Sequence, residues 1–159
     1  MIANRGVHRI VPRPDTDAVA GRVRLSPVKF VWVGGMYLGA IVSGVLTFTW
    51  EAFALFIASS ALVLLTGHSV GMHRRLIHNS FDCPLWLEYL LVHAGVLVGI
   101  AGPLGMTRTH DMRDWAQRQP RCHDYYAHRQ PFLIDGYWQL FCDLVLDHPP
   151  RVRFEDRIA

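Results

Sequence analysis

Two long uncharged stretches constrain this chain more than any other feature of its sequence. In residues 30–50 the only ionisable side chain is the phenol of Tyr37, and residues 52–67 contain none. A helix needs about 20 apolar residues to cross a bilayer. The first stretch has that length, and the second reaches it by continuing to about residue 71. The sequence therefore predicts two transmembrane helices, at about 28–49 and 51–71.

The positions of the basic residues predict how these helices are oriented. Six basic residues precede the first apolar stretch, and two follow the second: Arg5, Arg9, Arg13, Arg22, Arg24 and Lys29, then Arg74 and Arg75. Positive charge at the membrane-flanking ends is typical of the cytoplasmic side. We therefore expect a multi-pass protein of the inner (cytoplasmic) membrane, with both ends in the cytoplasm and membrane lipid around it. The net charge of +3 is explained by this pattern, so we expect no nucleic-acid partner.

The rest of the chain is interpreted as one helical domain behind a polar arm. Residues 1–26 form a mobile basic arm, and Ser26 with Pro27 is typical of a helix start. Residues 84–104 are apolar but carry Glu88 and His93, which favours a helix in the membrane interface over a third span. Residues 105–159 are polar and rich in histidine, and are expected to be cytoplasmic. The predicted fold is all-α: a transmembrane hairpin, an interfacial helix and a cytoplasmic helical segment within a domain covering 27–159.

The three cysteines give no sign of a disulfide. Cys83, Cys122 and Cys142 lie far apart in the sequence, without CxxC spacing, and on the side expected to be cytoplasmic. Disulfides are rare in that compartment. A cleaved signal peptide is not expected either, because the first apolar stretch begins only after a long polar arm.

Histidine is the residue type that carries the chemistry of this sequence. The chain has nine histidines, and six of them fall in two windows: His68, His73 and His78, then His110, His123 and His128. Neutral imidazole is a good ligand for iron, zinc and copper. The remaining three, His8, His93 and His148, are each isolated and are assigned no role.

The spacing of His73 and His78 is unusual for a metal site. On an ideal α-helix five residues correspond to about 7.5 Å of rise and about 140° of rotation. Two ligands of one ion more often stand three or four residues apart, as in HExxH. The wider spacing indicates either two metal ions or a helix that changes its pitch between the two histidines.

The surroundings of these histidines resemble a known family. Residues 67–81 read GHSVGMHRRLIHNSF, which is similar to the first histidine box of membrane acyl-CoA and acyl-lipid desaturases. In that family the box follows a helical hairpin and precedes an apolar interfacial stretch, as it does here. The resemblance implies that His73 and His78 bind iron and that Arg74 is the arginine of the box.

The second box departs from the family pattern. Where the family has HxxHH, this chain has His110 at the first position but Arg113 and Asp114 at the positions of the paired histidines. We predict His110 and His123 as further iron ligands, and Asp114 or His128 as alternative replacements; the other interpretation is a weaker or altered metal site.

A third box and a second hairpin, which the family places further along, are missing from these residues. The resemblance therefore predicts a truncated or split N-terminal part of a diiron oxidoreductase. Such an enzyme uses O2 and an electron-transfer protein to introduce a double bond into a fatty acyl chain linked to CoA, to a lipid or to a carrier protein. Three alternatives stay open: a related membrane hydroxylase, a non-catalytic remnant or partner subunit, and a haem- or metal-transfer protein that uses His68 and His73.

Overall fold

The structure is a computed structural model that describes residues 9–155. It is mostly helical, which confirms the predicted all-α class, and the described part adds four short strands. The chain divides into two compact units, which are described separately. Residues 1–8, the start of the arm predicted to be mobile, lie outside the described residues, as do residues 156–159.

The first unit is built on one long helix. It comprises residues 49–111, together with Arg9 and the described residues 154–155. Helix α2 (Trp50–Leu62) continues without a break into η1 (Val63–Ile77). Together they are long and apolar enough to cross a membrane. Thr49 caps the start of the helix, and its side chain accepts a hydrogen bond from the Ala52 amide at 3.1 Å.

Helix α3 (Leu85–Val96) packs against η1 at very short distance. A Cβ placed on Gly67 would lie 2.3 Å from the carbonyl carbon of Ala94, and one on Gly71 would lie 2.4 Å from the Leu91 carbonyl oxygen. Only glycine permits this approach. Helix α3 falls within the segment predicted at 84–104 but ends at Val96, and the sequence gave no sign of its tight packing on η1.

An ion pair buried between the same two helices adds to this contact. Arg75 of η1 and Glu88 of α3 are 7% and 6% exposed, and their Nη2 and Oε2 atoms are 2.7 Å apart. Breaking such a pair from one side leaves an uncompensated buried charge, at a cost of about 3–5 kcal/mol. Glu88, which argued against a third span, is thus neutralised within the protein. The pair and the glycines fix η1 relative to α3.

The second unit contains the other candidate span. It comprises residues 10–48 and 112–153. Helix α1 (Pro27–Leu46) begins after Ser26 with Pro27 in its first turn, as predicted, and ends three residues earlier than expected. It is long and apolar enough to cross a membrane, and none of its residues is buried in the protein.

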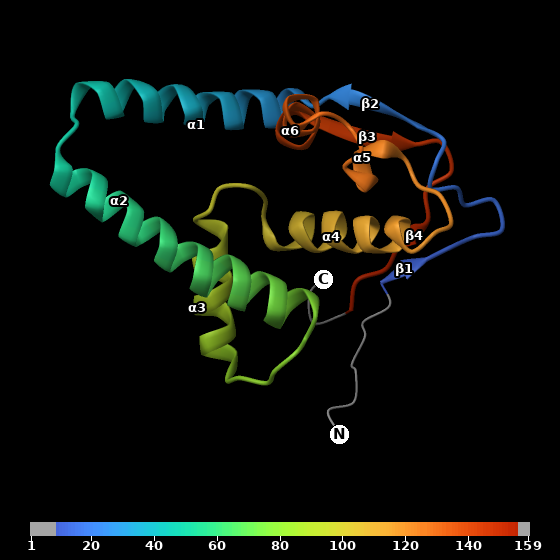
Figure 1. The fold of residues 1–159 in the computed structure, drawn as a ribbon. Coiled ribbons are helices and arrows are strands. Elements are labelled where there is room, and N and C mark those ends of the chain that lie inside the picture. Colours follow the sequence, from blue (N-terminus) through green and yellow to red (C-terminus); the bar gives the residue numbers. More distant parts are fainter. Residues whose placement is uncertain (1–8, 156–159) are drawn as a thin grey trace. The chain divides into compact units, whose positions relative to one another are not determined.

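Two antiparallel two-stranded sheets join the beginning and the end of this unit. Strand β1 (Ile10–Val11) pairs with β4 (Arg151–Val152), and β2 (Gly21–Leu25) pairs with β3 (Cys142–Leu146). Figure 1 shows β2 and β3 side by side. The strands β1 and β2 fall in the segment 1–26, for which the sequence predicted a mobile arm and no strand.

The helices of the second unit are short and surround a small core. Helix α4 (Pro103–Gln117) contributes its residues from Met112 onward, and α5 (Asp124–Ala127) and α6 (Phe132–Phe141) follow. Within the segment 105–159, which was predicted to be helical, α6 ends at Phe141 because the backbone of the next residues pairs with β2. The buried core consists of Ala18, Ala116, Tyr125, Tyr126 and Leu146.

Candidate metal centre

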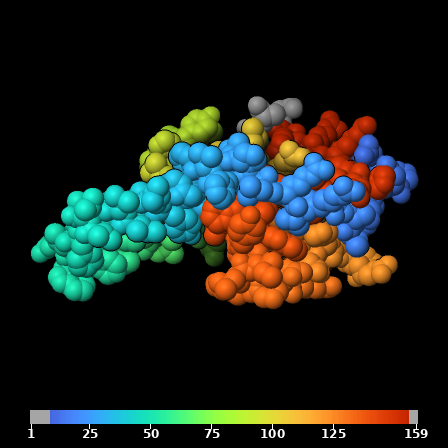
Figure 2. Space-filling model, turned by 90° about the horizontal axis from the view of Figure 1, so that it is seen from above, coloured from blue at the N-terminus to red at the C-terminus, as the bar shows by residue number. Residues whose placement is uncertain are grey.

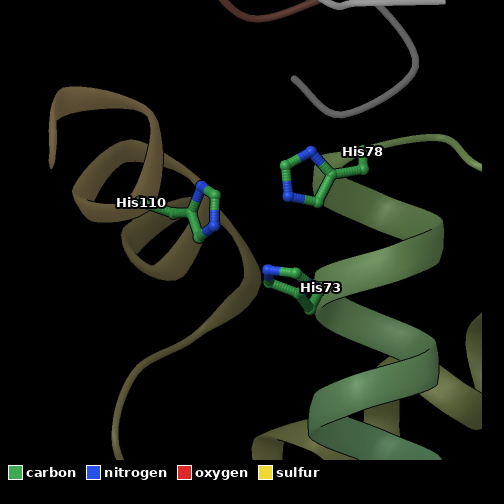
Figure 3. A group of neighbouring side chains, drawn as sticks. All are labelled: His73, His78 and His110. Atoms are coloured by element: carbon green, nitrogen blue, oxygen red, sulfur yellow. The ribbon is translucent and has the colours of Figure 1, made fainter. Parts of the chain in front are cut away.

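Three histidines converge in the first unit. His73 and His78 lie on η1, and His110 lies on α4. Their potential ligand nitrogens all lie within 4.8 Å of one another. The ring centroids are 4.5 Å apart for His73 and His78, and 5.0 and 4.9 Å from these two to His110. Figure 3 shows the three rings gathered around a common space between the two helices.

The pitch of η1 explains how His73 and His78 share a face. The segment is a π-helix, and the His78 amide donates to the His73 carbonyl at 3.1 Å. With i→i+5 hydrogen bonds, a residue lies one turn above its fifth predecessor. The five-residue spacing that is unfavourable on an α-helix therefore becomes favourable here. The five-residue spacing allowed either two metal ions or a helix with a changed pitch, and the structure shows the changed pitch.

A buried arginine joins the two segments that carry the histidines. Arg9 is 1% exposed, and its guanidinium donates to the carbonyls of Leu76 and Ile77 at 3.1 and 3.2 Å. It also donates to Asp111 Oδ2 at 3.0 Å and to Glu155 Oε2 at 2.9 Å. The two carbonyls belong to the last turn of η1, where helical carbonyls lack intrahelical partners. One side chain thus caps η1 and binds a carboxylate of α4.

These contacts lie directly beside two of the three histidines. Ile77 precedes His78, and Asp111 follows His110. Asp111 Oδ1 also lies 3.8 Å from His110 Nδ1. Carboxylates near ligand imidazoles commonly fix ring orientation at metal sites. This role of Arg9 was not predicted, because its partners lie 68 and 102 residues away and no local sequence pattern links them.

The donor set of the cluster fits one metal ion. Three neutral imidazoles suit iron, zinc or copper, and the spread of 4.8 Å is small enough for the three to face one ion. His73 and His78 are exposed and His110 is half-buried, so the cluster is accessible from outside. An open hollow adjoins it, lined by Val70, His73, Arg74, His78, Ser80 and Phe81. The three residues do not supply enough donors for two ions.

The other candidate ligands lie in the second unit and have local partners there. His123 precedes α5, and its Nδ1 accepts a hydrogen bond from the Tyr125 amide at 3.1 Å. His128 is paired with Asp135, with Nδ1 and Oδ2 2.8 Å apart. Asp114 lies 4.0 Å from Arg118, which directly follows the end of α4. The ligand role of His123 stays a prediction from the sequence.

Comparisons with known proteins agree with the desaturase resemblance. The chain is 27% identical over 139 residues to an sn-1 stearoyl-lipid 9-desaturase of Anabaena variabilis, covering 85% of this chain and 47% of the relative. It is 42% identical over 65 residues to a probable chloroplastic lipid desaturase of Arabidopsis thaliana, covering 40% and 17%. It is 29% identical over 112 residues to an sn-2 palmitoyl-lipid 9-desaturase of Nostoc sp., covering 67% and 37%.

These matches confirm the resemblance to fatty-acid desaturases, and the chain spans about half the length of these relatives or less. No model of a known protein family matches the chain. No solved structure matches it either. The two candidate spans, taken together with the similarity to lipid desaturases, indicate a membrane protein.

Proposed function

We propose that this chain supplies part of the iron site of a membrane fatty-acid desaturase. Such an enzyme introduces a double bond into an acyl chain with O2 and an external electron donor. The observation that carries the proposal is the convergence of His73, His78 and His110 within 4.8 Å. The similarity to lipid desaturases over most of the chain supports the assignment of this cluster to iron rather than to another metal.

In this proposal each residue of the first unit has a defined task. His73, His78 and His110 hold one iron ion through neutral imidazole nitrogens. Arg9 keeps η1 and α4 together, so that the imidazoles stay gathered when no metal is bound. When bound, iron supplies the redox chemistry with O2 that no protein side chain provides. Donors for a second iron must come from further residues, for which the sequence offers His123.

The partners follow from the same reasoning. We propose a fatty acyl substrate linked to a lipid, to CoA or to a carrier protein, and an electron-transfer protein that reduces the iron. Two of the relatives are named for stearoyl-lipid and palmitoyl-lipid substrates, which favours a lipid-linked chain. We also propose that the protein crosses the inner membrane twice, with the histidines and both ends on the cytoplasmic side, as the basic residues indicate.

Metal binding by the purified full chain tests the ligand assignment. Cobalt(II) gives an absorption spectrum that reports imidazole coordination, and elemental analysis gives the iron content after anaerobic loading. We expect His73→Ala and His78→Ala to weaken binding by more than about 100-fold, beyond the loss caused by removing an outer partner of a ligand. His148→Ala, which changes an exposed histidine of the second unit, is the matched control. Unchanged binding in both variants would remove the ligand assignment.

An assay of fatty acids in cells that express the chain tests the reaction. A desaturase increases the unsaturated fraction of the membrane acyl chains, and the increase must disappear with His73→Ala. A hydroxylated product instead identifies the related hydroxylase.

A second candidate function is a non-catalytic metal-binding subunit. Arg113 stands where the family pattern has a histidine, and its Nη2 donates to Gln139 Oε1 at 2.8 Å within the second unit. This position is thus occupied by a structural contact. Metal binding that depends on His73 without any change in acyl chains would favour this candidate.

A further inference from the structure

Helix α6 of the second unit presents its apolar side outward and its polar side inward. Leu133, Tyr137 and Leu140 follow an i, i+4, i+7 pattern, which places them on one face of a helix. They are 81%, 47% and 39% exposed, and Phe132 at the start of the helix is 87% exposed. In water a helix on the surface of a protein has the opposite arrangement. The apolar face therefore requires an apolar surrounding.

The inward face of α6 is held by polar contacts, so this orientation is fixed. Gln139 Nε2 donates to the Tyr125 carbonyl at 2.9 Å, and Asp135 pairs with His128. Trp138 stacks on Tyr125 with ring centroids 6.4 Å apart. Turning α6 about its axis would break all of these contacts. The outward position of Leu133 and Tyr137 is thus a property of the unit.

The second unit places this apolar face beside a candidate membrane span. The Ser26 amide donates to the Phe141 carbonyl at 2.9 Å, which joins the end of α6 to the residue that begins α1. The rings of Phe30 and Phe141 lie 5.8 Å apart. Figure 2 shows the orange atoms of α6 next to the blue atoms of α1. The helix lies at the end of α1 where a span enters the bilayer.

We propose that α6 lies in the membrane interface and inserts its outward face into the lipid. Its ten residues are too few to cross a bilayer, which takes about 20, but they suit a helix lying in the interface. Tyr137 is of the type that is enriched at the membrane surface, and phenylalanines such as Phe30 and Phe141 suit the apolar side of an interfacial contact. Arg129, exposed just before α6, is placed to meet lipid phosphates. Uncharged residues along the face favour lipid over a water-soluble partner.

This inference depends on α1 entering the bilayer, and it goes beyond the metal centre and the reaction. It also differs from the interfacial helix that the sequence predicted at 84–104. It adds a second contact with the membrane, in the part of the chain that was expected to be entirely cytoplasmic. It does not require iron to be bound.

Quenching of a fluorescent label by lipid tests the proposal on the full chain in nanodiscs. The background carries Cys83→Ser and Cys122→Ser, and Cys142 stays because it is 4% exposed. Leu133→Cys and, on the same face, Tyr137→Cys receive a bimane label. Nanodiscs contain phosphatidylcholine brominated high on its acyl chains. We expect quenching about twofold stronger or more than for a label that remains in water, since interfacial helices insert about 5–10 Å into the acyl boundary.

Two control positions separate the possible failures. Arg118→Cys, in the same unit and with a side chain that is 75% exposed, must be quenched weakly by the brominated lipid and strongly by iodide in water. Val31→Cys, 73% exposed on α1, must be quenched by lipid. If Val31 is quenched but Leu133 and Tyr137 behave like Arg118, the inference about α6 is wrong while the span stands. If Leu133 is protected from both quenchers, a protein surface covers α6 and the inference is also wrong. If Val31 is not quenched by lipid, α1 does not enter the bilayer, and both the predicted span and the inference about α6 are wrong.

Discussion

The histidines of the two units are used in different ways. In the first unit His73 and His78 lie on successive turns of η1, and His110 comes from α4. The three side chains nevertheless converge. In the second unit His123 and His128 each interact with a residue two or seven positions away, as a helix cap and as an ion-pair partner. Both groups looked alike in the sequence. The difference shows that histidine density identifies a region, whereas the elements that carry the histidines decide whether they converge.

The two units also differ in how they use glycine and arginine. In the first unit Gly67 lies against the backbone of α3 and Arg9 is buried, so both act on the placement of the cluster. In the second unit Gly39 on α1 has no neighbour within 4 Å of an added Cβ, and Arg13 is exposed. Gly67 and Arg9 therefore each have a counterpart of the same residue type in the second unit. Substitutions of Gly67, Arg9 and His123 test the comparison of the two units.

The largest effect is expected for Gly67→Ala. The added Cβ would lie 2.3 Å from backbone atoms of Ala94, so η1 and α3 must separate. Overpacking of this kind costs about 1–3 kcal/mol, and the upper end applies because backbone cannot move aside as a side chain does. Thermal unfolding of the detergent-solubilised chain measures the loss. Gly39→Ala should leave the unfolding temperature unchanged or raise it slightly, because alanine favours the helix. Equal destabilisation by both would contradict the contrast between the units.

A smaller effect is expected for Arg9→Ala. Loss of the guanidinium frees the end of η1 from Asp111, so the imidazoles must be ordered by the metal itself. We expect cobalt(II) affinity to fall about 10-fold, as for loss of an outer-shell partner. The helix content measured by circular dichroism should change little. Arg13→Ala, in an exposed residue with a contact to Asp15, is the control.

The outcome for Arg9 separates positioning from general stabilisation. A positioning role lowers metal affinity in addition to any loss of stability that follows from leaving the Asp111 and Glu155 carboxylates without the guanidinium. If affinity is kept and only stability falls, Arg9 is a structural residue and has no specific link to the cluster.

The smallest effect is expected for His123→Ala. The side chain accepts one hydrogen bond at the start of α5, and loss of such a cap costs about 0.5–2 kcal/mol. The stability of the second unit should fall by that amount, while metal binding by the first unit should not change. Loss of metal from this variant would instead support the ligand role that the sequence predicted and would break the contrast between the two groups of histidines.

The sequence predicted those elements whose cause is local. The spans at 28–49 and 51–71 follow from the absence of charge, and α1 begins at Pro27 as the capping pattern indicated. The helix within 84–104 was also predicted, and His73, His78 and His110 were selected through the resemblance. Each of these inferences needs only neighbouring residues or a fixed motif.

The features that were missed depend on contacts between distant residues. Strand β2 exists because Gly21 faces Leu146, and no pattern within residues 21–25 contains that information. The same pairing ends α6 at Phe141, because the residues that follow form β3. The place of Arg9 and the cap formed by His123 likewise depend on which backbone groups lack partners after folding.

The contacts of Arg9 also set an order of assembly. This residue is synthesised early, but Leu76 and Ile77, then Asp111, and finally Glu155 arrive one after another, and the last bond joins residues 146 positions apart. Contacts so distant in sequence form late because closing a long loop must precede them. Arg9 can therefore bind Leu76, Ile77 and Asp111 before Glu155 has been made, and the contact with Glu155 closes the longest of these loops.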